Sequence, residues 1–380
     1  MVIAVDASAM TSSAVISEEE AALYDRQIRL WGLEAQTRLK NAHVMLIGLG
    51  GLGTEVAKNI VLAGVKRLAI TDPTNVSERD FHSNFFLQAQ GMGANRVKAS
   101  LPRCQALNPN VKLEELNIPI DQIDQTILQS FDLVCVTDQS VEITNKLAIA
   151  CRKLDVAFCA GATHGWIGYT FSDFGDKFEF AEERKAPPIR SSGDDGGIQC
   201  LNTSDEIVIG ADSTLDSGND DDHAPPVEKK RRRAESVHEE DNRVELVKQT
   251  IGFSRFADAF VNDWPAKGVS ARAIKQIPAG YFVVRALQVQ AKKTDSKLED
   301  CWNQVLKQCR VDEKIIGTTF KDFHSYIDDE LAPVCAVVGG VMSQEAIKAI
   351  SQKDRPLNNT FVYNALNTTG IVSNLPPAPK

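Results

Sequence analysis

The sequence predicts an α/β protein built on a Rossmann-like, doubly wound sheet. Three observations lead to this prediction. Short apolar runs alternate with segments of helical spacing, a glycine-rich turn over residues 48–53 directly follows the first apolar run, and Asp72 ends the next run. This order is typical of a parallel βαβ unit, in which a strand, a glycine turn, a helix and a second strand are followed by an acidic residue. Its repetition along the chain predicts an open sheet covered by helices on both faces.

A helical leader is expected before the first strand. Residues 1–16 are expected to form a flexible tail. Ser17 followed by Glu20 matches a capping box, in which each residue satisfies a backbone N–H of the other at the start of a helix. Gly32 is expected to interrupt this helix, and a second helix continues to Lys40.

The βα alternation defines the next elements. Strands are predicted over residues 42–47, 67–72, 111–118, 131–138 and 156–160. Helices are predicted over residues 54–63, 94–108 and 141–154. Residues 17–165 are therefore expected to form the first part of the main domain.

The rest of the chain is expected to fall into three segments. Aromatic and glycine alternation predicts a small β-rich excursion over residues 166–185 that leaves the main sheet. Proline pairs and clusters of aspartate and glycine predict a disordered insertion over residues 186–243. Residues 244–380 regain apolar periodicity and complete the main domain, with a helix over 326–349, in which Pro333 marks a start or kink, and a strand over 359–364.

Composition excludes several classes of protein. The 380 residues carry 42 Lys and Arg against 51 Asp and Glu, a net charge of −9, which argues against a general nucleic-acid binder. Neither a membrane-spanning apolar stretch nor a signal peptide is evident, so a soluble intracellular protein without a membrane partner is expected. None of the eight cysteines forms a C-x-x-C pair, so we expect buried, reduced thiols and no metal site.

The glycine turn is the first candidate site. Gly48, Gly50, Gly51 and Gly53 allow a backbone to approach phosphates at a helix N-terminus, and Asp72 is placed to accept ribose hydroxyls. On this pattern alone, an NAD(P) dehydrogenase and a Rossmann protein that only binds its nucleotide are both open. A third interpretation is tight packing between helix and strand in a fold that has lost its ligand.

The sequence of the leader resembles a known family, and this resemblance favours one of these alternatives. Residues 24–32 read Tyr-Asp-Arg-Gln-Ile-Arg-Leu-Trp-Gly, and with the glycine turn they resemble the adenylating domain shared by bacterial MoeB and ThiF proteins and the activating enzymes of ubiquitin-like modifiers. Residues 16–22, 332–340, 344–345 and 358–359 are more narrowly similar to the small, non-catalytic subunits of SUMO-activating enzymes. The resemblance implies a ThiF/MoeB-type adenylation fold.

The resemblance also implies an activity and partners. Two adenylating domains of this family pair, and the larger catalytic subunit carries the thioester cysteine and binds most of the Mg-ATP. The pair adenylates the C-terminal glycine of SUMO, transfers it to that cysteine and serves a downstream conjugating enzyme. On this chain, Arg26 would act in trans on the ATP of the partner, with Arg29 as the weaker candidate. Outside the family, the usual expectation is that Arg26 pairs with Glu19 or Asp25 on a solvated helix.

The nucleotide site departs from the family pattern. Residues 77–83 lack the Asn-x-x-Arg-Gln element of catalytic members, and Arg96 stands where those members have lysine. Asp138 is retained where the family places an aspartate near magnesium, although a strand-end cap is an equal interpretation. The glycine residues, Asp72 and Asp138 are therefore expected to form a partial, vestigial site, and the chain is not expected to be catalytic alone.

Several alternatives stay open at this point. The chain could be the regulatory subunit for a NEDD-type modifier, or a self-sufficient homodimer of the MoeB type. Gly339 and Gly340 could allow close helix packing or form a helix C-cap. The basic run at residues 229–233 is typical of a nuclear-import signal, so a location in the nucleus and also the cytoplasm is expected, with a solvated linker as the other interpretation.

Overall fold

The computed structural model describes residues 16–185, 244–265, 268–292, 297–318, 320–327 and 329–377. The chain divides into one unit of Met1–Glu182 with Lys248–Lys380, and a second unit of Glu183–Val247. The elements that position the candidate site belong to the first unit. The predicted insertion over 186–243, its basic run and all of the predicted tail except Ile16 lie outside the described residues.

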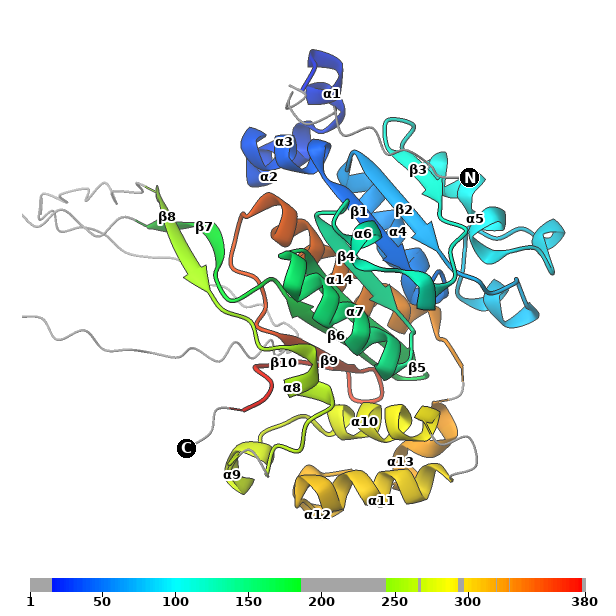
Figure 1. Ribbon diagram of the computed structural model, residues 1–380, viewed down its shortest axis with the longest axis vertical. Coiled ribbons are helices and arrows are strands. Elements are labelled where there is room, and N and C mark those ends of the chain that lie inside the picture. Colours follow the sequence, from blue (N-terminus) through cyan, green and yellow to red (C-terminus); the bar gives the residue numbers. More distant parts are fainter. Residues whose placement is uncertain are drawn as a thin grey trace, which may run out of the picture. The chain divides into compact units, whose positions relative to one another are not determined.

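An eight-stranded sheet forms the centre of the first unit (Figure 1). Five strands are parallel and follow the order β3-β2-β1-β4-β5. Three antiparallel strands, β6, β9 and β10, extend the sheet beyond β5. The strands are β1 His43–Ile47, β2 Arg67–Thr71, β3 Lys112–Glu115, β4 Leu133–Thr137, β5 Ala157–His164, β6 Ile167–Asp173, β9 Thr360–Asn364 and β10 Thr369–Ser373. The predicted doubly wound α/β fold is confirmed.

The predicted excursion over residues 166–185 is only half correct. β6 does not leave the main sheet, because it turns back at Gly165 and pairs with β5 from His164↔Ile167 to Phe158↔Asp173. All seven residues of β6 are buried, since both faces of the sheet are covered there. Only β7, Phe178–Lys185, departs, and it forms a separate two-stranded sheet with β8, Val244–Ile251.

The helical leader has the predicted capping box and glycine break. Helix α1, Glu18–Leu23, begins after Ser17, whose N–H donates to Glu20 Oε2 over 2.9 Å while the N–H of Glu20 donates to Ser17 Oγ over 3.2 Å. Helices α2, Asp25–Trp31, and α3, Leu33–Asn41, are separated by Gly32, whose φ of 91° ends the first of them.

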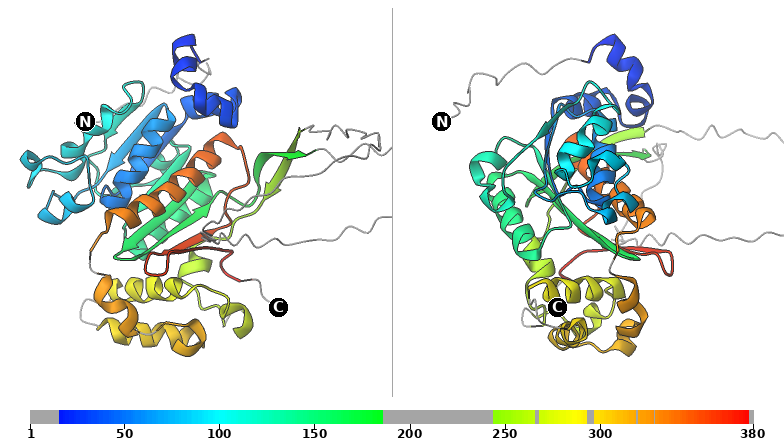
Figure 2. Two further views of the ribbon diagram at one scale, coloured as in Figure 1. Left: turned by 180° about the vertical axis from the view of Figure 1, so that it is seen from behind. Right: turned by 90° about the vertical axis from the view of Figure 1, so that its right-hand side faces the viewer.

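Helices cover both faces of the sheet because residues of its strands alternate between two apolar cores. Val44 and Leu46 belong to a core with α4 and α14, whereas Met45 and Ile47 belong to a core with α7 and α10. Figure 1 shows α7 in front of the sheet, and the left view of Figure 2 shows α4 and α14 side by side on the opposite face. The helices are α4 Gly51–Ala63, α5 Arg96–Gln105, α6 Gln125–Leu128, α7 Val141–Leu154, α10 Ala279–Lys292 and α14 Ala332–Ser351.

Aromatic side chains join the helices after β8 to the antiparallel end of the sheet. The ring of Phe171 on β6 lies 5.3 Å from that of Phe256, and the rings of Trp264 and Tyr281 stack at 5.0 Å. Such buried ring pairs contribute both apolar area and specific geometry. The remaining helices are α8 Phe256–Phe260, α9 Ala271–Ile274, α11 Leu298–Cys309, α12 Glu313–Ile316 and α13 Phe320–Phe323, with 3₁₀ turns at Glu78–His82, Ala89–Gly91, Ile120–Gln122 and His324–Tyr326.

Helix α14 begins at Ala332, six residues later than predicted, because Pro333 suits only the first turn of a helix. Among the described residues it is the one helix whose length and hydropathy would allow a membrane crossing, but 56% of its apolar window is buried as in a core helix. Gly339 lies within it against α4, where an added Cβ would stand 2.6 Å from the Cβ of Glu55. Close packing is therefore the role of Gly339, and the C-cap interpretation is wrong because the helix continues to Ser351.

Two adjacent glycines provide a test of this packing. Gly339→Ala is expected to lower the free energy of unfolding by about 1–3 kcal/mol, because the new methyl group forces α14 away from α4. Gly340→Ala meets no atom within 4 Å and should raise the free energy of unfolding by up to about 1 kcal/mol through helix propensity. Urea denaturation of the two variants measures both effects. Equal changes in the two variants would contradict the close approach of the helices.

Candidate functional site

The glycine loop lies between β1 and α4, where the strand order reverses between β1 and β4. This is the position at which doubly wound sheets bind ligands. Gly48 has a φ of +94°, and a Cβ added there would stand 2.3 Å from the carbonyl oxygen of Thr137. A Cβ on Gly53 would stand 2.3 Å from the carbonyl oxygen of Gly48. These two glycines are therefore required by the packing of the loop itself, whether or not a ligand is present.

Asp72 is a buried carboxylate that holds the loop in place. Its Oδ2 accepts the N–H of Leu49 over 2.8 Å and a bond from Arg96 Nη1 over 2.9 Å, while Oδ1 accepts the N–H of Thr74 over 2.8 Å. Both oxygens thus accept hydrogen bonds from within the chain, whereas the predicted role toward ribose hydroxyls stays a prediction. The aspartate after β2 supports the loop structurally here.

Arg96 is a buried cation shared between two carboxylates. It pairs with Asp72 over 2.9 Å and with Asp80 over 2.7 Å. Burial alone would lower the pKa of Arg96, but Asp72 and Asp80 outweigh burial and raise the pKa above its usual value. The guanidinium is thus held by two carboxylates of its own chain, one of which also accepts the N–H of Leu49 in the glycine loop.

Glu330 places a second carboxylate on the loop. Its Oε2 accepts the N–H of Gly51 over 2.7 Å and the hydroxyl of Ser83 over 2.7 Å. Sequence reasoning missed this residue because it lies 279 positions from Gly51 and belongs to no local pattern. Ser83 falls within the stretch that lacks the Asn-x-x-Arg-Gln element, so the departure noted in the sequence coincides with a new contact.

Asp138 ends β4 beside the same loop. It has a φ of 54°, and its Oδ1 accepts the N–H of Thr163 over 3.0 Å, which satisfies the strand-end interpretation. Its carboxyl keeps access to solvent but stands among many protein atoms. Loss of hydration, and next the charge of Glu330, raise the pKa of Asp138 well above its ordinary value.

These residues do not fit a bound magnesium nucleotide. The first N–H of α4 already has an anion, and the carboxylates of Asp72 and Glu330 place negative charge around the space that phosphates would need. No three His, Cys, Asp or Glu side chains of the described residues come together as metal ligands. The predicted site residues Gly48, Gly50, Gly51, Gly53, Asp72 and Asp138 are brought together, but around a protein carboxylate.

Arg26 lies apart from this group, on the exposed side of the leader. The leader is attached to the end of α4 by Tyr24, whose hydroxyl accepts from Asn108 Nδ2 over 2.8 Å, and by Gln27 Nε2, which donates to the carbonyl of Leu62 over 3.0 Å. Arg29 pairs with Asp25 over 3.0 Å. Arg26 is exposed and forms no hydrogen bond or ion pair with any described residue, so the expected pairing with Glu19 or Asp25 is not present.

The leader and the glycine loop stand at opposite ends of α4. This helix has 13 residues from Gly51 to Ala63, so it separates its two ends by about 20 Å. The loop precedes Gly51, whereas the attachment of the leader is at Leu62 and Gly64. Arg26 therefore cannot reach the glycine loop of its own chain.

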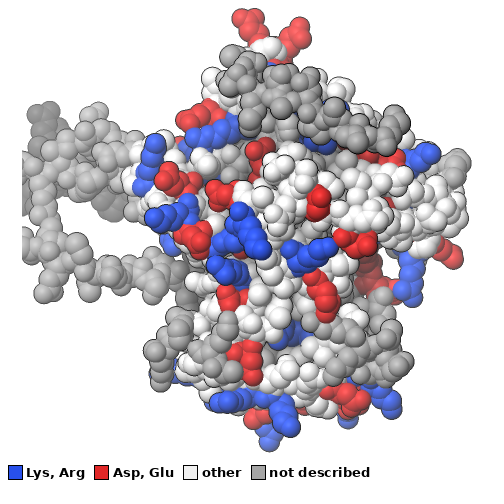
Figure 3. Space-filling model, in the orientation of Figure 1, with Lys and Arg blue, Asp and Glu red and all other residues white. Residues whose placement is uncertain are grey.

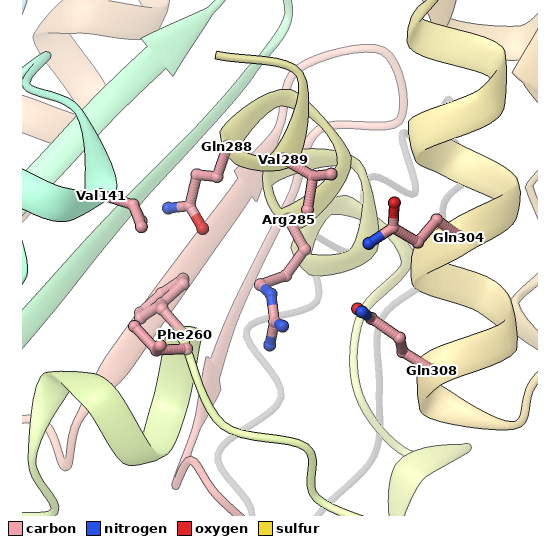
Figure 4. Close-up of a pocket in the computed structure, with 8 residues that line it drawn as sticks. Val141, Phe260, Arg285, Gln288, Val289, Gln304 and Gln308 are labelled. Atoms are coloured by element: carbon pink, nitrogen blue, oxygen red, sulfur yellow. The ribbon is translucent and has the colours of Figure 1, made fainter. Parts of the chain in front are cut away.

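A cavity of about 170 Å³ lies elsewhere, between α8, α10 and α11 (Figure 4). The guanidinium of Arg285 points into it and donates to the hydroxyl of Tyr281 over 3.0 Å. Carboxamides of Gln288, Gln304 and Gln308 also line it. None of the predicted site residues contributes to this cavity, so it does not extend the glycine-loop site.

The described cysteines do not offer a nucleophile. All seven are buried, and burial raises the pKa of Cys104, Cys151 and Cys335 to about 12. A thiol with such a pKa carries almost no thiolate at neutral pH.

On the face that Figure 3 shows, Lys and Arg are interspersed with Asp and Glu and form no extended area of one sign.

Comparisons with known proteins agree with this fold. The model of the ThiF family matches residues 24–380. SUMO-activating enzyme subunit 1 of Xenopus tropicalis is 38% identical over 94% of this chain and 96% of its own length. The human protein of the same name is 35% identical over 95% of this chain and 97% of its own length. A crystal structure of E. coli MccB with succinimide has a TM-score of 0.51 at 12% identity, covering 94% of this chain and 72% of that one, and supports the fold alone.

The raised pKa of Asp138 predicts a gain in stability when its charge is removed. A carboxyl whose pKa is higher in the folded than in the unfolded state destabilises the fold as pH rises through that interval, and has no such effect below the unfolded pKa of about 3.9. Asp138→Asn keeps the acceptor for Thr163 and should raise the free energy of unfolding at pH 7.5, with a smaller gain near pH 4. Urea denaturation at several pH values tests this. Asp155→Asn, at an exposed residue with the same left-handed backbone (φ 56°), is the matched control, and an equal gain there would contradict the interpretation.

Proposed function

The chain belongs to the ThiF family, and from this premise we propose that it is the small subunit of a heterodimeric SUMO-activating enzyme. A larger catalytic subunit binds Mg-ATP and carries the thioester cysteine. The complex adenylates the C-terminal glycine of SUMO, transfers the acyl group to that cysteine and passes it to a conjugating enzyme. Relatives that match nearly the whole chain carry the name of this subunit, which supports the assignment.

The observation that carries the proposal is the unpaired Arg26 on an exposed, charged leader that also carries exposed leucines. Three leucines of the leader are exposed, although the neighbouring Tyr24 is buried. Leu23, Leu30 and Leu33 are 60%, 74% and 56% exposed. Large apolar side chains gathered on one exposed element are typical of a surface that another protein covers. The leader therefore offers a docking surface with one unpaired guanidinium, about 20 Å from the glycine loop of its own chain.

We infer that Arg26 serves a nucleotide held by the larger subunit. A guanidinium presents two parallel N–H donors that match phosphate oxygens, and it stabilises the negative charge that develops during nucleotidyl transfer. The leader is attached to the rest of the chain through Tyr24 and Gln27, and it leaves the guanidinium of Arg26 exposed and without a partner among the described residues. Asp25 fixes Arg29 in an ion pair, which explains why the second arginine of the motif is the weaker candidate.

The two alternatives from the same family are less well supported. A self-sufficient homodimer of the MoeB type would require a nucleotide on the glycine loop of each copy, and Glu330 contacts that loop instead. A regulatory subunit for a NEDD-type modifier would share the fold. The names of the relatives favour SUMO as the modifier.

Arg26→Ala in the complex with the larger subunit is expected to lower SUMO adenylation while leaving the heterodimer intact. Arginines supplied in trans contribute about 10³–10⁵ in rate to phosphoryl transfer, and we expect a loss near the lower end of that range. ATP–pyrophosphate exchange in the presence of SUMO measures adenylation, and size-exclusion chromatography measures assembly. Arg26→Lys should recover only part of the rate, because a point charge cannot replace the fork.

Arg29→Ala is the matched control, since it removes a charge from the same helix at a residue that pairs internally with Asp25. It should change pyrophosphate exchange far less than Arg26→Ala. Normal exchange by the Arg26→Ala complex, or an equal loss in both variants, would refute the role in trans.

We further propose that the protein acts in the nucleus and also in the cytoplasm. The support is the basic run Lys-Lys-Arg-Arg-Arg at residues 229–233, a composition typical of nuclear-import signals. A fluorescent reporter fused to residues 220–240 should accumulate in the nucleus, and replacement of the five basic residues by alanine should abolish that accumulation. A reporter that stays in the cytoplasm with the intact sequence would oppose the proposal.

A further inference from the structure

Glu330 occupies the position at which nucleotide-binding folds of this class receive a phosphate. The first N–H groups of a helix have no partner within the helix, and together with the helix dipole they attract an anion. In α4 the first of these groups is the N–H of Gly51, and it donates to Glu330 Oε2 over 2.7 Å. The carboxylate therefore satisfies the donor that a phosphate oxygen would otherwise satisfy.

The glycines of the loop accommodate this carboxylate closely. A Cβ on Gly50 would stand 2.7 Å from Glu330 Oε1, and a Cβ on Gly51 would stand 2.8 Å from Oε2. Gly50 and Gly51 are therefore needed for the approach of Glu330, as they would be for a pyrophosphate. Ser83, which lies against Gly51, adds a hydroxyl donor to Glu330 Oε2 over 2.7 Å. An anion is thus held by a backbone N–H and a hydroxyl in the manner of a bound ligand.

The backbone around Glu330 holds the carboxylate in place. Glu330 forms a parallel bridge with Gly165 at the end of β5, and the carbonyl of Asp329 accepts the N–H of Gly165 over 2.7 Å. Helix α14 begins two residues after Glu330 and packs along α4. The side chain thus extends from a backbone segment that is bonded to the end of β5 and leads directly into α14.

The charges around the loop oppose a second anion. Asp72 and Asp138 stand beside Glu330, and the cation among these groups, Arg96, is already paired with Asp72 and Asp80. A triphosphate entering this space would meet the carboxylates of Asp72 and Glu330 and would have to displace Glu330 from the N–H of Gly51. Like charges at these distances repel strongly where water is partly excluded.

We propose that Glu330 is an internal carboxylate that replaces a nucleotide phosphate on the glycine loop, so that this chain keeps the loop as structure and excludes ATP from it. The inference rests on the proposed function in one respect, because it leaves ATP to the larger subunit. Glu330 then keeps the glycine loop of this chain closed to nucleotide.

The experiment measures binding of Mg-ATP and of inorganic tripolyphosphate to the purified full-length chain by isothermal titration calorimetry. The wild-type chain should bind neither at millimolar concentration. Glu330→Ala frees the N–H of Gly51 and the hydroxyl of Ser83, and should bind tripolyphosphate at least tenfold more tightly than the wild-type chain. Glu330→Gln keeps a carbonyl acceptor for Gly51 without the charge, so its gain should be smaller but measurable.

Asp329→Ala is the matched control, because it removes one negative charge from an exposed side chain next to Glu330 without changing the loop. It should bind tripolyphosphate no better than the wild-type chain. Thermal melting verifies that each variant is folded, and Glu330→Gln decides the matter if Glu330→Ala is not. Tight ATP binding by the wild-type chain, or a gain no larger for the Glu330 variants than for Asp329→Ala, would overturn the proposal.

The result is separable from a failure of the proposed function. Binding is measured on this chain alone, whereas the role of Arg26 is measured as pyrophosphate exchange in the complex. Normal exchange by the Arg26→Ala complex would remove that role and leave the binding result unchanged.

Discussion

The hydrogen bond between the N–H of Gly51 and the carboxylate of Glu330 joins the beginning of α4 to the segment before α14, 279 positions later. These two helices pack on one face of the sheet, and Gly339 lets them approach closely. The contact therefore joins two segments distant in sequence and also places a negative charge at the first N–H of the glycine-loop helix. The loop thus satisfies the first N–H of its own helix with a protein carboxylate, and Gly50 and Gly51 leave room for that carboxylate.

A second consequence follows from the length of α4. The helix places the glycine loop at one end and the leader at the other, so the phosphate-binding pattern and Arg26 belong to different surfaces of the molecule. Within one chain these two features cannot act on one ligand. Paired with a second adenylating domain, the exposed leader can contribute to a site that lies outside its own chain.

Local patterns were sufficient to predict most of the elements. Ser17 and Glu20 cap α1 as expected, α7 spans the predicted residues 141–154, and the parallel strands β1, β2 and β4 follow their apolar runs. The prediction for residues 166–185 failed for β6, because alternation within a strand does not specify its neighbour. Pairing with β5 depends on the turn at Gly165 and on the helices that cover both faces.

The sequence by itself determined the Rossmann-like fold and the leader motif, because each of these is written in contiguous residues, and its resemblance to the family marked the departures at residues 77–83 and Arg96. Only the tertiary structure decided what the candidate residues do. Asp72 holds the loop and Arg96, Asp138 accepts a backbone N–H, and Arg26 remains unpaired at the far end of α4. These roles depend on partners distant in sequence, above all Glu330, since a carboxylate can reach the loop only after the sheet has brought the two ends of the domain together.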